Sequence, residues 1–138
     1  MAKIFENNKD LEREDEAIRV FCEEHSAVYE KLGRFDIDFK VKIKNTVCFV
    51  EVKGRNRKIK DAYPLPISAR KIVKLCDKEG EGVIIWDCYD GLIYGNIKNI
   101  ESIGKVGGRK AREGSANDVE YMLYLDKQDK LIELLKTK

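Results

Sequence analysis

The sequence predicts a single α/β domain over residues 1–138, in which a mixed central β-sheet is flanked by helices. Residues 34–44 alternate between apolar and charged side chains, which is typical of a half-buried strand. Residues 46–53 are apolar on both sides until Glu51, which is typical of a strand covered on both faces. Apolar residues at helical spacing precede and follow this pair of strands. The length of 138 residues fits one domain, and a hydrophobic content of 43% supplies its core.

Residues 10–31 are expected to form the first helix. Asp10 can cap its start, acidic residues occupy the first turns where the helix dipole favours them, and Gly33 follows its end. Glu14 and His25 fall in the apolar stripe of this helix, and we expect His25 to be partly buried. The other members of the stripe are Leu11, Ile18, Phe21, Cys22 and Val28.

The two strands are expected to pair as an antiparallel hairpin around a tight turn at Lys44-Asn45. On the first strand, the apolar residues share one face and the charged residues share the other. The apolar face consists of Phe35, Ile37, Phe39, Val41 and Ile43, and the charged face consists of Asp36, Asp38, Lys40, Lys42 and Lys44.

The register of this hairpin predicts a cluster of charged groups at one end of the sheet. With the turn at Lys44-Asn45, Asp38 lies opposite Glu51. Asp36 then lies opposite Lys53, and cross-strand neighbours of this kind are about 5 Å apart. Carboxylates this close repel each other unless a cation neutralises them, and a hard divalent ion such as Mg²⁺ or Mn²⁺ prefers oxygen ligands. Such an ion can activate water beside a phosphodiester.

The rest of the chain continues the alternation of strands and helices. The helix predicted at 67–79 turns an inner side of Ala69, Ile72, Val73, Leu75 and Cys76 toward the core. The other expected segments are a basic loop at 54–66, strands at 83–88 and 92–97, a glycine-rich basic loop at 104–118, a strand at 119–125 and a closing helix at 127–136.

Charge is distributed unevenly along the chain, although the net charge is only +2. Residues 31–74 carry 13 basic and 4 acidic residues, whereas residues 1–30 carry 4 basic and 9 acidic residues. A basic middle third favours a surface that faces a polyanion.

Composition argues against several other classes of protein. The four cysteines have no zinc-ligand spacing, and we expect buried free thiols instead. No apolar run is long enough to cross a bilayer, and the first residues lack the apolar segment of a signal peptide. We therefore expect no membrane partner and a cytoplasmic location.

The motif Phe-Asp-Ile-Asp-Phe at 35–39 and the motif Val-Glu-Val-Lys-Gly-Arg at 50–55 together resemble the PD-(D/E)xK nuclease superfamily. In that superfamily an Asp and a Glu-x-Lys motif stand on adjacent strands, after a helix that often supplies another Glu. Here Phe35 stands where many members have Pro. The resemblance implies a restriction-endonuclease-like core of the α-β-β-β-α-β type, and it is nearest to small phage-type or Holliday-junction-resolvase-like members.

The resemblance also implies roles for individual residues. Glu14, Asp36 or Asp38, and Glu51 would hold Mg²⁺ or Mn²⁺, with Lys53 assisting the attacking water or the scissile phosphate. The aromatic-Asp pattern of phage-type relatives favours Asp36, whereas the hairpin register favours Asp38. Nucleic acid would be bound by basic residues of the loops and the second helix: Arg55, Arg57, Lys58, Lys60, Lys71, Arg109 and Arg112.

The predicted function is a Mg²⁺-dependent DNA endonuclease that is structure-selective or weakly sequence-specific. If the enzyme cuts both strands, the small size favours a homodimer, and a phage-encoded protein would act in the host cytoplasm. An alternative is a catalytically inactive nucleic-acid-binding module of the same fold in a phage recombination or packaging assembly. A purely protein-binding domain is a third reading.

Overall fold

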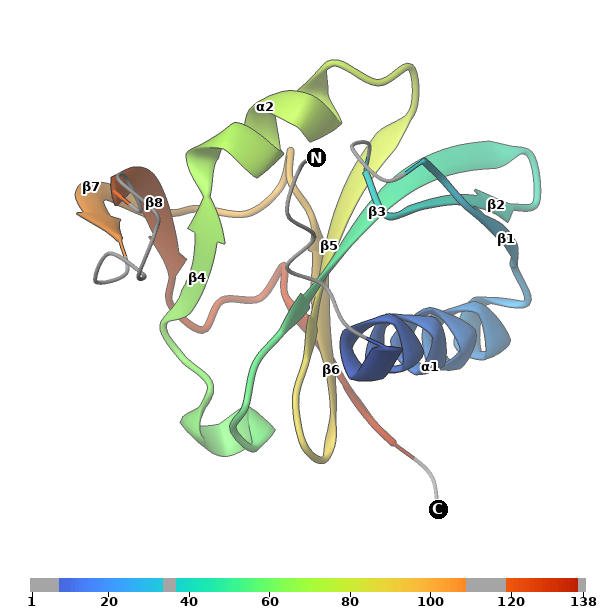
Figure 1. The fold of residues 1–138 in the computed structure, drawn as a ribbon, viewed down its shortest axis with the longest axis horizontal. Coiled ribbons are helices and arrows are strands. Elements are labelled where there is room, and N and C mark those ends of the chain that lie inside the picture. The colour runs from blue at the N-terminus through green and yellow to red at the C-terminus, as the bar shows by residue number, and fades with distance from the viewer. Residues whose placement is uncertain (1–7, 34–36, 109–118, 137–138) are drawn as a thin grey trace.

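The computed structural model describes residues 8–33, 37–108 and 119–136, and these residues form an α/β fold (Figure 1). The described residues begin with helix α1 (Asn8–His25), and a second, short helix, α2 (Ala69–Cys76), precedes strand β5 (Glu81–Asp87). A single 3₁₀ turn, η1 (Ile59–Asp61), lies between them. The strands are β1 (Val28–Lys31), β2 (Phe39–Ile43), β3 (Thr46–Gly54), β4 (Leu65–Ser68), β5 (Glu81–Asp87), β6 (Gly91–Asn96), β7 (Ile103–Gly108), β8 (Val119–Leu125) and β9 (Ile132–Leu135).

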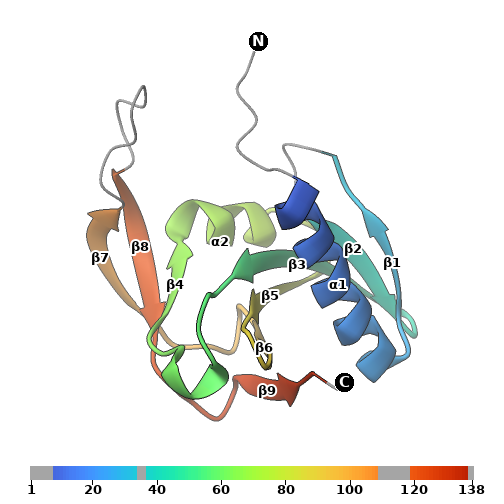
Figure 2. The same cartoon turned by 60° about the horizontal axis from the view of Figure 1, so that its bottom comes forward.

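Most of the strands form one mixed sheet in the order β1-β2-β3-β5-β6-β9. Strands β3 and β5 are parallel, and the other neighbours in this sheet are antiparallel. A smaller antiparallel sheet has the order β4-β8-β7 and lies beside α2 (Figure 2). With β4 set apart because it belongs to the smaller sheet, the succession α1, β1, β2, β3, α2 and β5 corresponds to the α-β-β-β-α-β core that the family resemblance implied.

Two buried clusters cover the two faces of the large sheet. Phe21 of α1 packs with Val50 and Val52 of β3 on one face. Leu75 of α2 packs with Trp86 of β5 on the other face. Because successive side chains of a strand point to opposite faces, Glu51 projects toward the α2 side.

The predicted β2–β3 hairpin is confirmed, including its turn. Ile43 pairs with Thr46, and Phe39 pairs with Val50. Lys44 adopts a left-handed conformation with φ of 55°. The strand begins at Phe39, and residues 34–36 lie outside the described residues. Ile37 is buried as predicted, but it packs in the cluster on the α2 side rather than beside Phe39.

The first helix is shorter than predicted. It ends at His25, and Ser26 has a φ of 51°, a left-handed conformation that stops a helix. The following residues form β1, whose pairing with β2 aligns Val28 with Lys42. Val28 is therefore an exposed edge residue (68%) and not part of the helical stripe. His25 is half-buried as predicted, and its Nε2 lies 3.0 Å from the hydroxyl of Tyr94.

The second helix is also shorter than predicted, because β4 occupies its expected beginning. Ser68 caps α2, and its hydroxyl accepts a hydrogen bond from the N–H of Arg70 at 3.2 Å. A helix of eight residues covers the sheet with one narrow side, which buries Leu75. Val73 (64% exposed) and Cys76 point outward, so their predicted inner positions are wrong. The other three cysteines are buried free thiols, as expected.

The C-terminal third differs most from the prediction. Residues 103–108 form strand β7 instead of loop, while residues 109–118 lie outside the described residues. The predicted helix at 127–136 is absent, and β9 in its place pairs with β6. The strand predicted at 119–125 is present as β8. Among the described residues, neither helix has the length and apolar character needed to cross a membrane.

Candidate active site

The structure brings Asp38 and Glu51 together at the point where the β2–β3 hairpin register places them opposite each other. Oδ2 of Asp38 accepts a hydrogen bond of 2.8 Å from the N–H of Val52, the residue after Glu51. This bond fixes the Asp38 carboxylate against the edge of β3. The carboxyl groups are close enough to share a hydrogen bond when Glu51 carries the proton.

Glu51 is a buried acid, only 6% exposed. Its Oε1 is buried, and no hydrogen-bond donor reaches that atom within the described part of the chain. Burial and the neighbouring Asp38 carboxylate raise the pKa of Glu51 to about 8. Burial also raises the pKa of Asp38, although the N–H of Val52 opposes that shift. The pair therefore holds a proton at neutral pH when no cation is bound.

Two lysines lie beside the carboxylate pair. Nζ of Lys71, in the first turn of α2, lies 3.4 Å from Oε2 of Glu51. The positive charge of Lys31, on β1, acts on Asp38 and lowers its pKa. Lys71 was predicted as a phosphate contact, whereas Lys31 was not predicted as part of a site. Lys31 was missed because residues Val28–Lys31, which form a strand, were included in the helix predicted over 10–31.

Glu14 lies near this group but does not join the carboxylate pair directly. Its side chain is largely buried (13% exposed), and its Oε2 lies 3.2 Å from Nζ of Lys31. Lys31 is therefore in contact with the helical glutamate, and its charge also acts on Asp38. The inward position that the sequence predicted for Glu14 is confirmed.

The remaining predicted catalytic residues are Lys53 and Asp36. Lys53 is half-buried and lies two residues after Glu51 on β3, so both side chains leave the same face of the strand. Asp36 lies outside the described residues.

The donor set of Asp38 and Glu51 suits a hard divalent cation. Carboxylate oxygens are the ligands that Mg²⁺ and Mn²⁺ prefer, and a cation would neutralise a pair that otherwise retains a proton. The donorless Oε1 of Glu51 supplies a free ligand atom. Within residues 8–33, 37–108 and 119–136, however, no three His, Cys, Asp or Glu side chains converge on one point.

Among the predicted nucleic-acid-binding residues, Arg55 forms its side-chain hydrogen bonds within the loop that follows β3. Its Nε donates to the carbonyl oxygen of Ala62 at 2.9 Å, and its Nη2 donates to that of Pro64 at 3.4 Å. Burial lowers the pKa of Arg55. Its side chain therefore holds the loop closed.

Arg57, Lys58 and Lys60 are exposed, and within the described part of the chain their side chains form no ion pair. They border an open cavity next to η1. The two remaining basic predictions, Arg109 and Arg112, lie outside the described residues.

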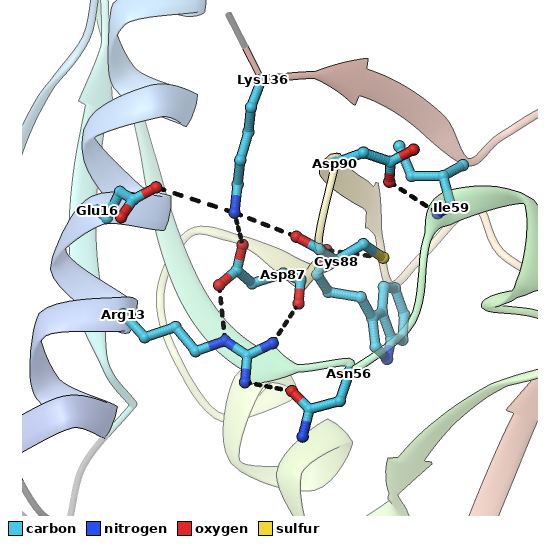
Figure 3. Close-up of polar contacts among 9 residues, drawn as sticks. Arg13, Glu16, Asn56, Ile59, Asp87, Cys88, Asp90 and Lys136 are labelled. Carbon is cyan, nitrogen blue, oxygen red and sulfur yellow. Dashed lines mark hydrogen bonds and ion pairs between the residues drawn. The ribbon is translucent and has the colours of Figure 1, made fainter. Parts of the chain in front are cut away.

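A second buried acid, Asp87 at the end of β5, was not singled out from the sequence (Figure 3). Its Oδ2 lies 2.8 Å from Nε of Arg13 on α1, and its Oδ1 lies 2.7 Å from Nζ of Lys136. Arg13 also donates to the carbonyl oxygen of Asp87 at 2.7 Å and to Oδ1 of Asn56 at 2.7 Å. Each carboxylate oxygen of Asp87 therefore contacts a cation, and the cluster joins α1, β5 and the C-terminal segment.

The α-β-β-β-α-β core, with Asp38 directly before β2 and a Glu-x-Lys motif on the adjacent strand β3, defines a PD-(D/E)xK-type protein. A family model described as "phage putative PDDEXK endonuclease" matches residues 1–130, and the chain belongs to this family. Comparison with curated proteins gives no match, and comparison with solved structures gives none either.

Proposed function

We propose that the protein is a metal-dependent endonuclease that hydrolyses phosphodiester bonds in DNA. The observation that carries the proposal is the pair of adjacent acids, Asp38 and Glu51, with one buried Glu51 oxygen that no donor of the described residues satisfies. Such a pair is unfavourable for stability alone, because it holds two acids in a poorly solvated place. Family membership supports a nucleic-acid substrate for this site.

In this proposal Asp38 and Glu51 hold the divalent cation, which is Mg²⁺ or Mn²⁺. The bound ion would supply charge stabilisation at the phosphate and a more acidic water. Lys53 follows Glu51 on the same face of β3 and holds a phosphate oxygen or orients the water. Hydrolysis joins the water oxygen to phosphorus, breaks one P–O bond to a sugar oxygen, and delivers a proton to that leaving oxygen.

Glu14, Lys31 and Lys71 have supporting roles in the proposal. Glu14 fixes Lys31 through their 3.2 Å contact, and Lys31 in turn lowers the pKa of Asp38. Lys71, which lies 3.4 Å from Glu51, would be available to a phosphate if a divalent ion neutralised that carboxylate. Glu14 is the third candidate ligand, and Mn²⁺ binding by Glu14→Gln tests that role.

The direct test is a cleavage panel. Linear duplex, single-stranded, nicked and four-way-junction DNA are incubated with Mg²⁺ or Mn²⁺ against an EDTA control. We expect cleavage only with the metal, and loss of at least 100-fold in rate in Glu51→Gln. Glu30→Gln, at an exposed position of β1, is the matched control and retains the wild-type rate. Equal cleavage by Glu51→Gln and the wild type contradicts the assignment.

One observation favours a second candidate, a nucleic-acid-binding module without catalysis. The ammonium group of Lys71 already lies against Glu51 and provides a positive charge at that carboxylate. In that case DNA binds without a divalent ion, and Mn²⁺ adds no thermal stability. The same panel separates the candidates, because the binding module retains DNA but cuts none of the substrates.

A further inference from the structure

Apart from the carboxylate pair, the α2 side of the sheet carries another candidate binding surface, which is formed by the loop that follows β3 and by the β5–β6 turn. It is an open cavity of about 670 Å³, bordered by Arg57, Lys58, Lys60, Tyr63 and Tyr89 together with Asn56 and Asp61. This volume lies within the range of about 300–1,000 Å³ that is typical of sites for small molecules and cofactors. The cavity is large enough to receive a nucleotide from solvent.

The two loops that border the cavity are bonded to each other. The N–H of Tyr89 donates to the carbonyl oxygen of Arg57 at 2.9 Å. The N–H of Ile59 donates to Oδ1 of Asp90 at 2.9 Å. Ile59 is also buried in the cluster that contains Leu75 of α2. The walls are therefore fixed in place before any ligand arrives, which reduces the entropy lost on binding.

The charge of this cavity favours an anion. Arg57, Lys58 and Lys60 are exposed, whereas Asp61 is the one acid among the residues that border it. No ion pair of these three cations is formed with any described residue, so their charges remain available. A phosphate-bearing ligand is the complementary partner.

The two tyrosines that border the cavity differ in how firmly their side chains are held. Tyr63 is half-buried, and its hydroxyl donates to Oε2 of Glu133 at 2.7 Å, so it is a fixed wall. Tyr89 is 64% exposed, and no hydrogen bond of its hydroxyl is formed with the described residues. An exposed aromatic ring on an anchored backbone, beside free cations, is the arrangement on which an unpaired base stacks.

Strand β3 links this cavity to the carboxylate pair. Glu51 lies three residues before Gly54, where β3 ends, which corresponds to about 10 Å along the strand. The loop that borders the cavity begins directly after Gly54. One strand of nucleic acid could therefore cross both places.

From these features we infer that the cavity binds an unpaired nucleotide of the DNA substrate. Tyr89 stacks on the base, and Arg57, Lys58 and Lys60 hold the adjoining phosphates. The inference rests on the proposed nuclease function and adds its substrate class, which is DNA with a single-stranded segment next to the cleaved bond. A fully paired duplex buries its bases and offers nothing to stack on Tyr89.

The first experiment measures affinity for DNA of different form by fluorescence anisotropy in EDTA. The full chain is titrated into a labelled duplex and into the same duplex with a short unpaired flap. We expect tighter binding to the flap substrate, and a reduction of this preference by about tenfold in Tyr89→Ala. Tyr89→Phe keeps the ring and retains the preference. Tyr121→Ala, at a half-exposed tyrosine of β8, is the matched control.

The second experiment reports stacking directly. A 2-aminopurine placed in the flap loses fluorescence when an aromatic ring stacks on it. We expect quenching with the wild type and Tyr89→Phe but not with Tyr89→Ala. Arg57→Gln should reduce the slope of log affinity against log salt by about 0.7, the value for one phosphate contact on single-stranded DNA. Lys44→Gln, at the exposed hairpin turn, should leave that slope unchanged.

The outcomes separate this inference from the proposed function. Metal-dependent cleavage without any flap preference, or a preference that Tyr89→Ala retains, overturns the inference and leaves the nuclease intact. Absence of binding to either DNA also overturns the inference, and the cleavage panel with Mg²⁺ or Mn²⁺ then tests the nuclease separately. Loss of the preference and of the quenching in Tyr89→Ala, with Tyr89→Phe unchanged, supports the cavity as the site for the unpaired nucleotide.

Discussion

Nζ of Lys71 lies 3.4 Å from Oε2 of Glu51, so the first turn of α2 places a positive charge beside the most deeply buried acid of the candidate active site. We expect Lys71→Met to raise the pKa of Glu51 further, because the attraction that favours its ionised form is lost. Carboxyl-selective NMR titration of the metal-free protein measures this shift. Lys74→Met, one turn later on α2, is the comparison. An unchanged Glu51 titration would show that the two charges do not interact.

The stability of the metal-free protein should decrease as pH rises. Between the ordinary Glu pKa of 4.5 and the value of about 8 for Glu51, the folded protein retains a proton that the unfolded chain has lost. The stabilisation is complete below pH 4.5 and disappears as pH rises through about 8. The slope from this group is at most about 1.4 kcal/mol per pH unit. Urea unfolding in EDTA at several pH values should show a flatter profile for Glu51→Gln; identical profiles would contradict the prediction.

Metal binding should release protons near neutral pH. Because Glu51 is protonated in the metal-free protein, binding of Mn²⁺ must displace about one proton at pH 7. Calorimetric titrations in two buffers of different ionisation enthalpy measure this number. Glu51→Gln and Asp38→Asn should bind Mn²⁺ at least tenfold more weakly, whereas Glu14→Gln reveals whether the helical acid is also a ligand. Binding without proton release would refute the protonated pair.

The two aspartates of the Phe-Asp-Ile-Asp-Phe motif can be distinguished. Asp38→Asn preserves an oxygen that can accept from the N–H of Val52, so the hairpin should keep its stability. We expect this variant to lose cleavage and Mn²⁺ binding, because Asp38 is the acid placed against Glu51. Asp36→Asn should retain more of both than Asp38→Asn. The reverse order would assign the ligand to Asp36.

Neighbouring arginines of the loop should respond to substitution in different ways. Arg55→Lys loses the paired hydrogen bonds to Ala62 and Pro64 and should lower the free energy of unfolding by about 1–2 kcal/mol. Arg57→Lys, at an exposed position, should leave the free energy of unfolding unchanged. Urea denaturation compares the two. Equal stability of both variants would show that Arg55 does not hold the loop.

The β2–β3 hairpin and its acids could be predicted from the sequence because their signals are local. Alternation with a period of two and a tight turn at Lys44 fix which residues face each other. The contact between Asp38 and Glu51 continues that register by one position beyond the pair Phe39 and Val50. The inward position of Glu14 followed from helical periodicity in the same way.

Features that depend on distant partners could not be predicted. Residues 28–31 and 132–135 carry weak local signals, and their strand structure depends on pairing with β2 and β6. The approach of Lys31 to Asp38 and of Tyr89 to the 54–64 loop arises from the same long-range pairing. Asp87 gave no signal because its cations, Arg13 and Lys136, are separated from it by 74 and 49 positions.

The contacts of Asp87 also affect the order in which parts of the chain can fold during synthesis. During synthesis the N-terminal Arg13 emerges early, whereas Lys136 is translated 49 positions after Asp87. Until that lysine leaves the ribosome, the acid at the end of β5 has only one of its two cations, and strand β9 cannot close the sheet edge. A ribosome-bound chain therefore cannot close this edge of the sheet, or complete the cation cluster around Asp87, until residue 136 has been translated.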